Sequence, residues 1–271
     1  MKQRYTVEDL QYLMSRLRDP DGGCPWDLKQ TFASIVPSTI EEAYEVAEAI
    51  EREDFEHLHE ELGDLLFQVI FYAQLGQEQG HFDFPRIVDT LVRKLVRRHP
   101  HVFPGADLYD DTEEKSAVDI DEQQVKVNWE VIKAEERRAK GEKGTLDGVA
   151  VGLPALTRAA KLQKRASQVG FDWPEIDGVL AKVEEEVREL REAIASGNRA
   201  HAHEELGDLL FSCVNVARHL KVDPEAALRQ CNRKFEQRFG AVESALTARN
   251  QRPSDVSLEE LDRLWEQAKQ Q

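Results

Sequence analysis

The chain of 271 residues has few cysteines, few aromatic side chains and no long hydrophobic run. Its three cysteines, Cys24, Cys213 and Cys231, form no CxxC pair, which argues against a disulfide framework or a zinc site and suits a reducing cytosol. No apolar stretch approaches the roughly 20 residues that span a bilayer, and the first ten residues lack the apolar core of a signal peptide. We therefore expect a cytoplasmic protein that does not enter the membrane.

Basic residues are scarce relative to acidic ones, because 36 Lys and Arg oppose 52 Asp and Glu and leave a net charge of −16. A field of this sign repels phosphate backbones, so we expect no binding to duplex nucleic acid. The negative charge does not exclude binding of a small phosphorylated ligand, provided that metal ions lie between its phosphates and the acidic side chains.

A long internal repeat organises the chain. The segment His59–Phe67, which reads HEELGDLLF, recurs unchanged as His203–Phe211, a spacing of 144 residues. The same spacing carries the Glu-Glu-x-x-Glu segment at residues 41–45 onto residues 185–189. Two copies with so long a period indicate duplicated domains and not a solenoid.

The boundary between the copies can be placed from composition. Residues 104–124 are acidic with little periodicity and are typical of a loop. Residues 141–153 are rich in glycine and are predicted to be a linker. We therefore expect a first domain at residues 1–140 and a second at residues 154–271.

Both copies are predicted to be helical. Apolar residues recur at the i, i+3, i+4 spacing that marks one helix face. These residues are Leu62, Leu65, Leu66, Val69 and Ala73 in the first copy, and Leu206, Leu209, Leu210, Cys213 and Ala217 in the second. The helix before them has an apolar face formed by Val183, Val187, Leu190 and Ile194. No segment alternates as a strand does, so each copy is expected to be an all-α bundle of four or five helices.

The same helices carry carboxylates. At about 100° per residue, Glu185, Glu186 and Glu189 share one helix face, opposite the apolar one. In the next helix Glu205 and Asp208 are i, i+3 neighbours. If the two helices pack antiparallel with these faces converging, four or five carboxylates meet in one cleft.

The negative charges of such neighbouring carboxylates repel one another, and a bound divalent cation offsets this repulsion. Ligation by carboxylate oxygens alone suits Mg²⁺ or Mn²⁺. A glutamate-rich face ordinarily faces water, but these positions match between the two copies. A di-iron site is the alternative and would need Glu-x-x-His on each of two helices. Glu56-x-x-His59 occurs once, and Ala200 stands at the matching position.

Each ELGDLLF helix also contains a glycine, Gly63 or Gly207, which costs about 1 kcal/mol relative to alanine. Either a close helix crossing or the close approach of a ligand explains a glycine at this position.

Further segments add to these motifs: GGCPWD at 22–27, RRHPHVF at 97–103, VGFDW at 169–173, KFEQR at 234–238, and Trp-Glu-x-x-Lys at 129–133 and 265–269. Together with the two carboxylate patterns they resemble the MazG family of bacterial nucleoside triphosphate pyrophosphohydrolases, within the all-α NTP pyrophosphatase superfamily. The resemblance covers nearly the whole chain.

The resemblance implies Mg²⁺-dependent hydrolysis of an NTP or dNTP to the monophosphate and pyrophosphate, with a broad range of bases, in nucleotide-pool cleaning or a stress response. It assigns metal ligation to Glu186, Glu189, Glu205 and Asp208 in the second copy, and to Glu42, Glu45, Glu61 and Asp64 in the first. Glu185 remains as the candidate to orient or deprotonate the attacking water.

Basic and aromatic residues would then contact the substrate. The candidates are Lys182, Lys234, Arg238 and Lys269 for the phosphates, Trp173 for stacking on the base, and Trp265 as a further substrate-binding residue. An ordinary surface cation or a core tryptophan is the alternative for each. His201 stands where family members can carry lysine, so one phosphate contact is expected to be weaker or to depend on pH.

The two copies differ around equal carboxylates, because Ser38 matches Lys182 and the loop at 171–173 occurs only in the second copy. We expect the second copy to be the main active site and the first to be a weaker site, a regulatory site or a dimer scaffold. The resemblance also implies a homodimer. The competing hypothesis is a regulator that binds nucleotides or a toxin–antitoxin or other stress-related protein, and the complete second quartet favours the enzyme.

Overall fold

The computed structural model describes residues 4–109, 121–139, 141 and 144–270. Within these ranges the chain forms ten α-helices and two short 3-10 helices and contains no strand, which confirms the all-α prediction. Most of the acidic segment predicted at 104–124, and residues 142–143 of the predicted linker, lie outside the described residues. None of the described helices is long and apolar enough to cross a bilayer.

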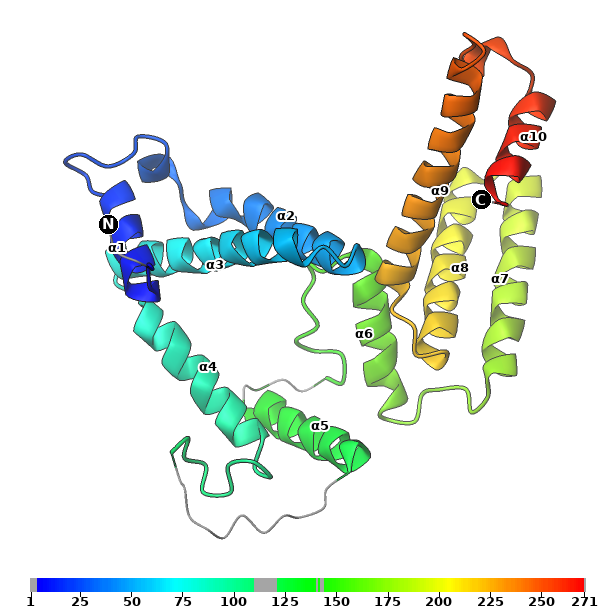
Figure 1. Cartoon of the computed structure of the whole chain (residues 1–271). Helices are drawn as coiled ribbons and strands as arrows, with labels where there is room; N and C mark the ends of the chain where they lie inside the picture. The colour runs from blue at the N-terminus through cyan, green and yellow to red at the C-terminus, as the bar shows by residue number, and fades with distance from the viewer. Residues whose placement is uncertain (1–3, 110–120, 140, 142–143, 271) are drawn as a thin grey trace. The chain divides into compact units, whose positions relative to one another are not determined.

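The chain divides into two compact units, Met1–Lys133 and Ala134–Gln271, with the division inside α5 (Figure 1). The helices of the first repeat are α1 (Val7–Leu17), η1 (Asp27–Lys29), α2 (Phe32–Glu51), α3 (Phe55–Glu78), α4 (Phe84–Arg98) and α5 (Glu122–Ala139). Those of the second are α6 (Ala155–Ser167), α7 (Ile176–Ala195), α8 (Arg199–His219), α9 (Pro224–Thr247), η2 (Pro253–Asp255) and α10 (Leu258–Ala268).

A hairpin of two long helices lies at the centre of each unit, α2 with α3 and α7 with α8 (Figure 1). Its turn is three residues long and contains one residue of positive φ, Glu53 at 56° or Gly197 at 70°, as is common just after a helix. The second helix of each pair begins at an N-cap, Asp54 or Asn198, whose side chain accepts a backbone N–H hydrogen bond three residues on. These local signals fix where each hairpin turns.

The two units are packed differently. Large side chains form the core of the first unit: Met14, Ile35, Ile70, Phe71 and Leu75, with Leu10, Phe32, Phe67, Tyr72 and Phe84 against them. In the second unit a smaller cluster, Val242, Leu246 and Leu264, lies between α9 and α10. The second unit therefore leaves space around its central hairpin, as the site below shows.

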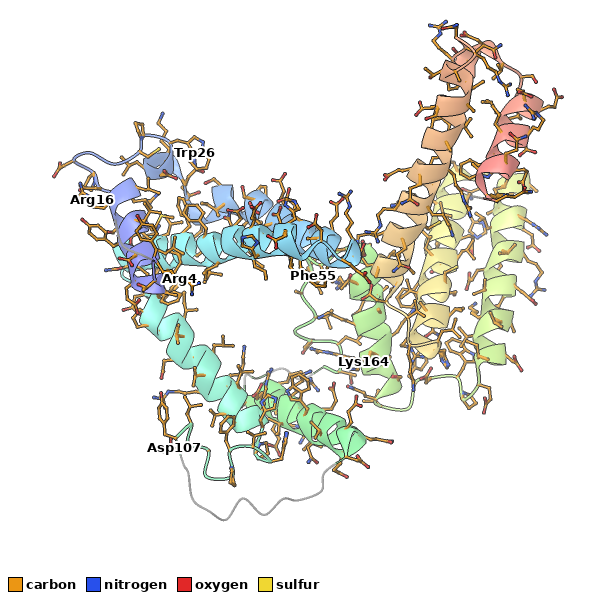
Figure 2. All side chains as sticks on the ribbon, viewed as in Figure 1. Arg4, Arg16, Trp26, Phe55, Asp107 and Lys164 are labelled. Carbon is orange, nitrogen blue, oxygen red and sulfur yellow. The ribbon has the colours of Figure 1, made fainter. Side chains whose placement is uncertain are left out.

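The predicted apolar helix faces are buried only in part: Ala73 is 4% exposed, but several leucines of these faces stay exposed. Leu62 and Leu206 stay 49% and 47% exposed, and Ile194, on the predicted apolar face of α7, is 64% exposed. Phe55, labelled in Figure 2 at the start of α3, is exposed as well. Each hairpin instead packs partly through the carboxylate face, so a periodic leucine pattern marked the helix correctly but not the side that faces the unit's interior.

Candidate active site

The hairpin of α7 and α8 gathers carboxylates of the second copy into one cluster. One carboxylate oxygen from each of Glu186, Glu205 and Asp208 lies within 4.8 Å of the other two. Glu186 is 4% exposed and Glu205 is 9% exposed, so two of the three charges are buried. Glu189 lies outside this trio, but burial, and then the charges of Glu205 and Glu185, raise the pKa of its carboxyl group.

The first copy repeats the arrangement. Oxygens of Glu42, Glu45 and Glu61 lie within 4.8 Å of one another between α2 and α3. Burial, and then the neighbouring charges of Asp64 and Glu45, raise the pKa of the Glu42 carboxyl group. The convergence of carboxylates that the antiparallel packing implied is therefore present in both units.

This donor set fits a hard divalent cation. Carboxylates at such distances repel one another, and burial first, then this repulsion, raises the pKa of the Glu42 and Glu189 carboxyl groups. Carboxylate oxygens are ligands that Mg²⁺ and Mn²⁺ accept. Neither carboxylate group of the described residues includes a histidine, so neither has the composition of a di-iron site.

A histidine pairs with one carboxylate in each cluster; the sequence reasoning overlooked His57 and did not predict that His201 contacts a glutamate. His57 Nε2 lies 2.8 Å from Glu61 Oε1, and His201 Nε2 lies 2.9 Å from Glu205 Oε1. Both histidines stand one helical turn before the glutamate, and this i, i+4 pair recurs at the repeat spacing, which is the signal that could have revealed them. Each histidine side chain thus orients a buried carboxylate.

Lys182 distinguishes the second cluster from the first. Its Nζ lies 2.7 Å from Glu186 Oε1 and 3.1 Å from Glu185 Oε1. Hydrogen bonds to Glu186 first, and then to Glu185, raise the pKa of the Lys182 ammonium group. At the matching position Ser38 can offer no charge, so only the second copy has a lysine at this place in the cluster.

A cavity of about 580 Å³ opens beside the second cluster. Its lining includes Lys182, Glu186 and Asp208 from the hairpin, and Phe171 and Trp173 from the loop between α6 and α7. Its volume is in the range of pockets that take small organic ligands. The cavity therefore joins a charged end to an aromatic wall.

The loop that forms this wall is anchored to both helices of the hairpin. The Asp172 carboxylate accepts hydrogen bonds from the Arg218 guanidinium group and from His219 Nε2 of α8, and the pairing with Arg218 lowers the pKa of Asp172. Trp173 packs on Gly178 of α7, where a Cβ atom would lie 2.5 Å from the indole Cδ1. Glycine at 178 is thus required for the observed position of Trp173.

Phe71 of the first copy shows how the two units diverged. It occupies the position that matches Asn215 in the second copy. Phe71 is 1% exposed and belongs to the aromatic core, whereas Asn215 lines the cavity. The first unit uses this position for core packing and the second for a polar cavity wall.

Gly63 and Gly207 face open space. A Cβ atom at either position would meet no described atom within 4 Å outside its own helix backbone. Within each unit a close helix crossing therefore does not require these glycines, and the approach of another molecule stays a prediction.

Four predicted substrate contacts lie elsewhere in the second unit. The lining of this cavity in the described structure does not include them: Lys234 and Arg238 lie on α9, Trp265 on α10, and Lys269 directly after α10. Trp265 packs on Phe235, with ring centroids 5.2 Å apart, and Lys269 pairs with Glu266. The roles proposed for these residues stay predictions.

The fold and the two clusters define an all-α protein in which paired helices present converging carboxylates. A sequence model of the MazG nucleotide pyrophosphohydrolase domain matches residues 30–103 and 175–242, so that each match includes one hairpin. The chain therefore belongs to the MazG family.

Several relatives are similar over most of the chain. The nucleoside triphosphate pyrophosphohydrolase of Escherichia coli is 48% identical over 98% of this chain and 97% of its own length. The nucleoside triphosphate pyrophosphohydrolase/pyrophosphatase MazG of Thermotoga maritima is 42% identical over 97% of this chain and 95% of its own. The nucleoside triphosphate pyrophosphohydrolase of Mycolicibacterium smegmatis is 32% identical over 70% of this chain and 61% of its own.

Because the carboxylates of each cluster repel one another, we expect the folded protein's stability to depend on divalent cations. We expect Mg²⁺ or Mn²⁺ at 100 times its Kd to stabilise the native state by about 2.7 kcal/mol per site, seen as a rise in melting temperature after EDTA treatment. Asp64→Asn combined with Asp208→Asn should remove most of that rise, whereas Asp262→Asn on α10 should keep it. If the melting temperature of the EDTA-treated protein does not change when Mg²⁺ or Mn²⁺ is added, the metal assignment is contradicted.

Proposed function

We propose that this chain hydrolyses nucleoside triphosphates or deoxynucleoside triphosphates to the monophosphate and pyrophosphate with the help of Mg²⁺, or Mn²⁺ in its place. The observation that carries the proposal is the trio of Glu186 and Glu205, both buried, with the exposed Asp208, at the edge of a cavity that can accept a nucleoside. Relatives that match nearly the whole chain are named nucleoside triphosphate pyrophosphohydrolases, which supports the same reaction.

The carboxylates Glu186, Glu189, Glu205 and Asp208 would hold the cation. When bound, Mg²⁺ supplies an activated water and neutralises oxygens of the triphosphate. Glu185 would orient or deprotonate that water; its carboxylate lies 3.1 Å from the ammonium nitrogen of Lys182, which also pairs with Glu186 of the cluster.

Lys182 and Trp173 would position the substrate from two sides. Lys182 lines the cavity next to the carboxylates, so its charge is available to a phosphate oxygen. Trp173, fixed by Gly178, offers an aromatic surface on which any base can stack, which fits a broad range of bases. Four further candidates would contact the substrate only if the end of a chain that contains α9 and α10, of this copy or of a second one, approaches the site. These are Lys234, Arg238, Lys269 and Trp265.

The first copy keeps the carboxylates but not the rest of this machinery. Ser38 replaces the lysine, and Phe71 fills the core at the position of Asn215. We therefore infer that the first unit is a weaker site, a regulatory site or a scaffold. A role in nucleotide-pool cleaning or stress response, a stress-related protein partner and a cytoplasmic location remain predictions of the sequence.

A panel of NTPs and dNTPs with Mg²⁺ tests the reaction directly. We expect the monophosphate and pyrophosphate as products with every base. Release of orthophosphate and the diphosphate would show cleavage between the β- and γ-phosphates and contradict the proposal.

Isosteric substitutions should separate the two copies. We expect Glu205→Gln or Asp208→Asn to lower the single-turnover rate for a dNTP by about 10²–10³, because each removes one charge that stabilises the transition state. The matched first-copy variants Glu61→Gln and Asp64→Asn should keep much of the activity, with circular dichroism confirming the fold of all four. Equal losses in both sets would mean that both sites are catalytic or tightly coupled.

We further propose that two copies of this chain associate through the leucine faces of the hairpins. Leu206 and Leu210 of α8 are about half exposed, and Leu62 and Leu66 of α3 repeat them in the first unit. Regular apolar faces on long helices are surfaces that soluble proteins cover by association. A homodimer would cover the same face on both chains.

Charges placed on this face should dissociate the dimer. We expect the wild-type chain to sediment at twice its mass of 31.0 kDa, and Leu206→Glu with Leu210→Glu to shift it toward the monomer. Leu258→Glu, at a leucine of α10 that is 79% exposed, is the control and should leave the dimer intact. A wild-type chain that sediments as a monomer at micromolar concentration would exclude the proposed interface.

A further inference from the structure

Gln163 of α6 is a buried polar residue in the wall of the nucleotide cavity. It is 8% exposed and lines the cavity together with Trp173 and Glu186. Its Nε2 donates a hydrogen bond to the backbone oxygen of Phe211 in α8, with the two atoms 2.8 Å apart. Because a carbonyl oxygen can only accept, this bond fixes which end of the amide is the NH₂ group and leaves Oε1 at the other end.

The Gln163 Oε1 atom is buried, and within the described residues no group donates a hydrogen bond to it. Buried acceptors in native proteins are nearly always paired, so an orphaned one indicates a partner from outside the chain. Oε1 is also screened from solvent, and Gln163 lines the cavity, so a molecule bound in the cavity is the candidate source of the missing donor.

The chemistry of the cavity identifies that donor. Phosphates belong near Lys182 and the carboxylate-bound cation, so the base occupies the part of the cavity with the aromatic wall. Every common base has an N–H group on its pairing edge, an amino group in adenine and cytosine and a ring N–H in guanine, uracil and thymine. One acceptor can serve any of these donors, which agrees with a broad range of bases.

We propose that Gln163 is a specificity-determining residue, whose Oε1 accepts a hydrogen bond from an N–H group on the edge of the bound base. This inference rests on the proposed function of the second unit. Gln163 selects nucleotides whose base offers such a donor and discriminates against bases that lack one. Its bond to Phe211 holds the acceptor in place between α6 and α8.

A substrate that lacks the donor tests the proposal. Unsubstituted purine deoxyriboside triphosphate differs from dATP by the loss of the 6-amino group, and kcat/KM for both is measured on the full chain by pyrophosphate release. We expect the wild type to prefer dATP about tenfold or more, because the analogue leaves Oε1 unpaired. Gln163→Leu should reduce that preference to near one, while Gln168→Leu, at an exposed glutamine just beyond α6, should retain it.

The outcomes separate recognition from other roles. If Gln163→Leu lowers kcat/KM for both substrates equally and keeps the preference, Gln163 supports the structure only and the inference is wrong. If the variant does not fold, the wild type alone decides, because equal kcat/KM for dATP and the analogue overturns the inference. A wild type that releases no pyrophosphate from any nucleotide refutes the proposed function itself, and this inference with it.

Discussion

Mutual repulsion of carboxylates buried between two packed helices is the constraint around which each unit is arranged. In the second unit Glu186 and Glu205 are almost fully buried next to Asp208, and each has a basic side chain one turn before it, Lys182 or His201. The Lys182 ammonium group offsets part of the negative charge but leaves an excess. A bound divalent cation would remove that excess, so the electrostatic problem of the hairpin and the chemistry of phosphate hydrolysis would have the same solution.

Duplication placed this hairpin in the chain twice, and substitutions around it gave the copies different interiors. The first unit packs Phe71, Ile70 and Leu75 tightly at the centre, whereas the second keeps a cavity lined by Asn215 and Gln163. A well-filled core stabilises the fold, and a cavity sacrifices some of that packing for a ligand. Both units keep the carboxylates, whereas Lys182 and the cavity beside the cluster belong to the second unit, which is consistent with a division between scaffold and catalysis.

The repeat and the helical periodicity predicted the all-α fold and the convergence of the carboxylates, because both follow from spacing along a helix. They did not predict which helix face is buried. Periodicity shows that Leu206 and Leu210 share a face, but whether the same unit or another molecule covers that face depends on tertiary packing. The repeat did not predict the contact between His57 and Glu61 either, because His57 lies outside the segment that recurs unchanged.

The cavity was beyond prediction for a related reason. Gln163 and Phe211 lie far apart in the sequence and meet only because α6 packs on α8. The anchoring of Trp173 by Gly178 likewise depends on the path of a loop that has no regular pattern.

Anomalous X-ray scattering from crystals of the full chain grown with Mn²⁺ tests the central claim most directly. The account predicts an anomalous peak in the second unit within bonding distance of oxygens from Glu186, Glu205 and Asp208. Peaks found only at other acidic groups, with these three carboxylates unligated, would contradict it.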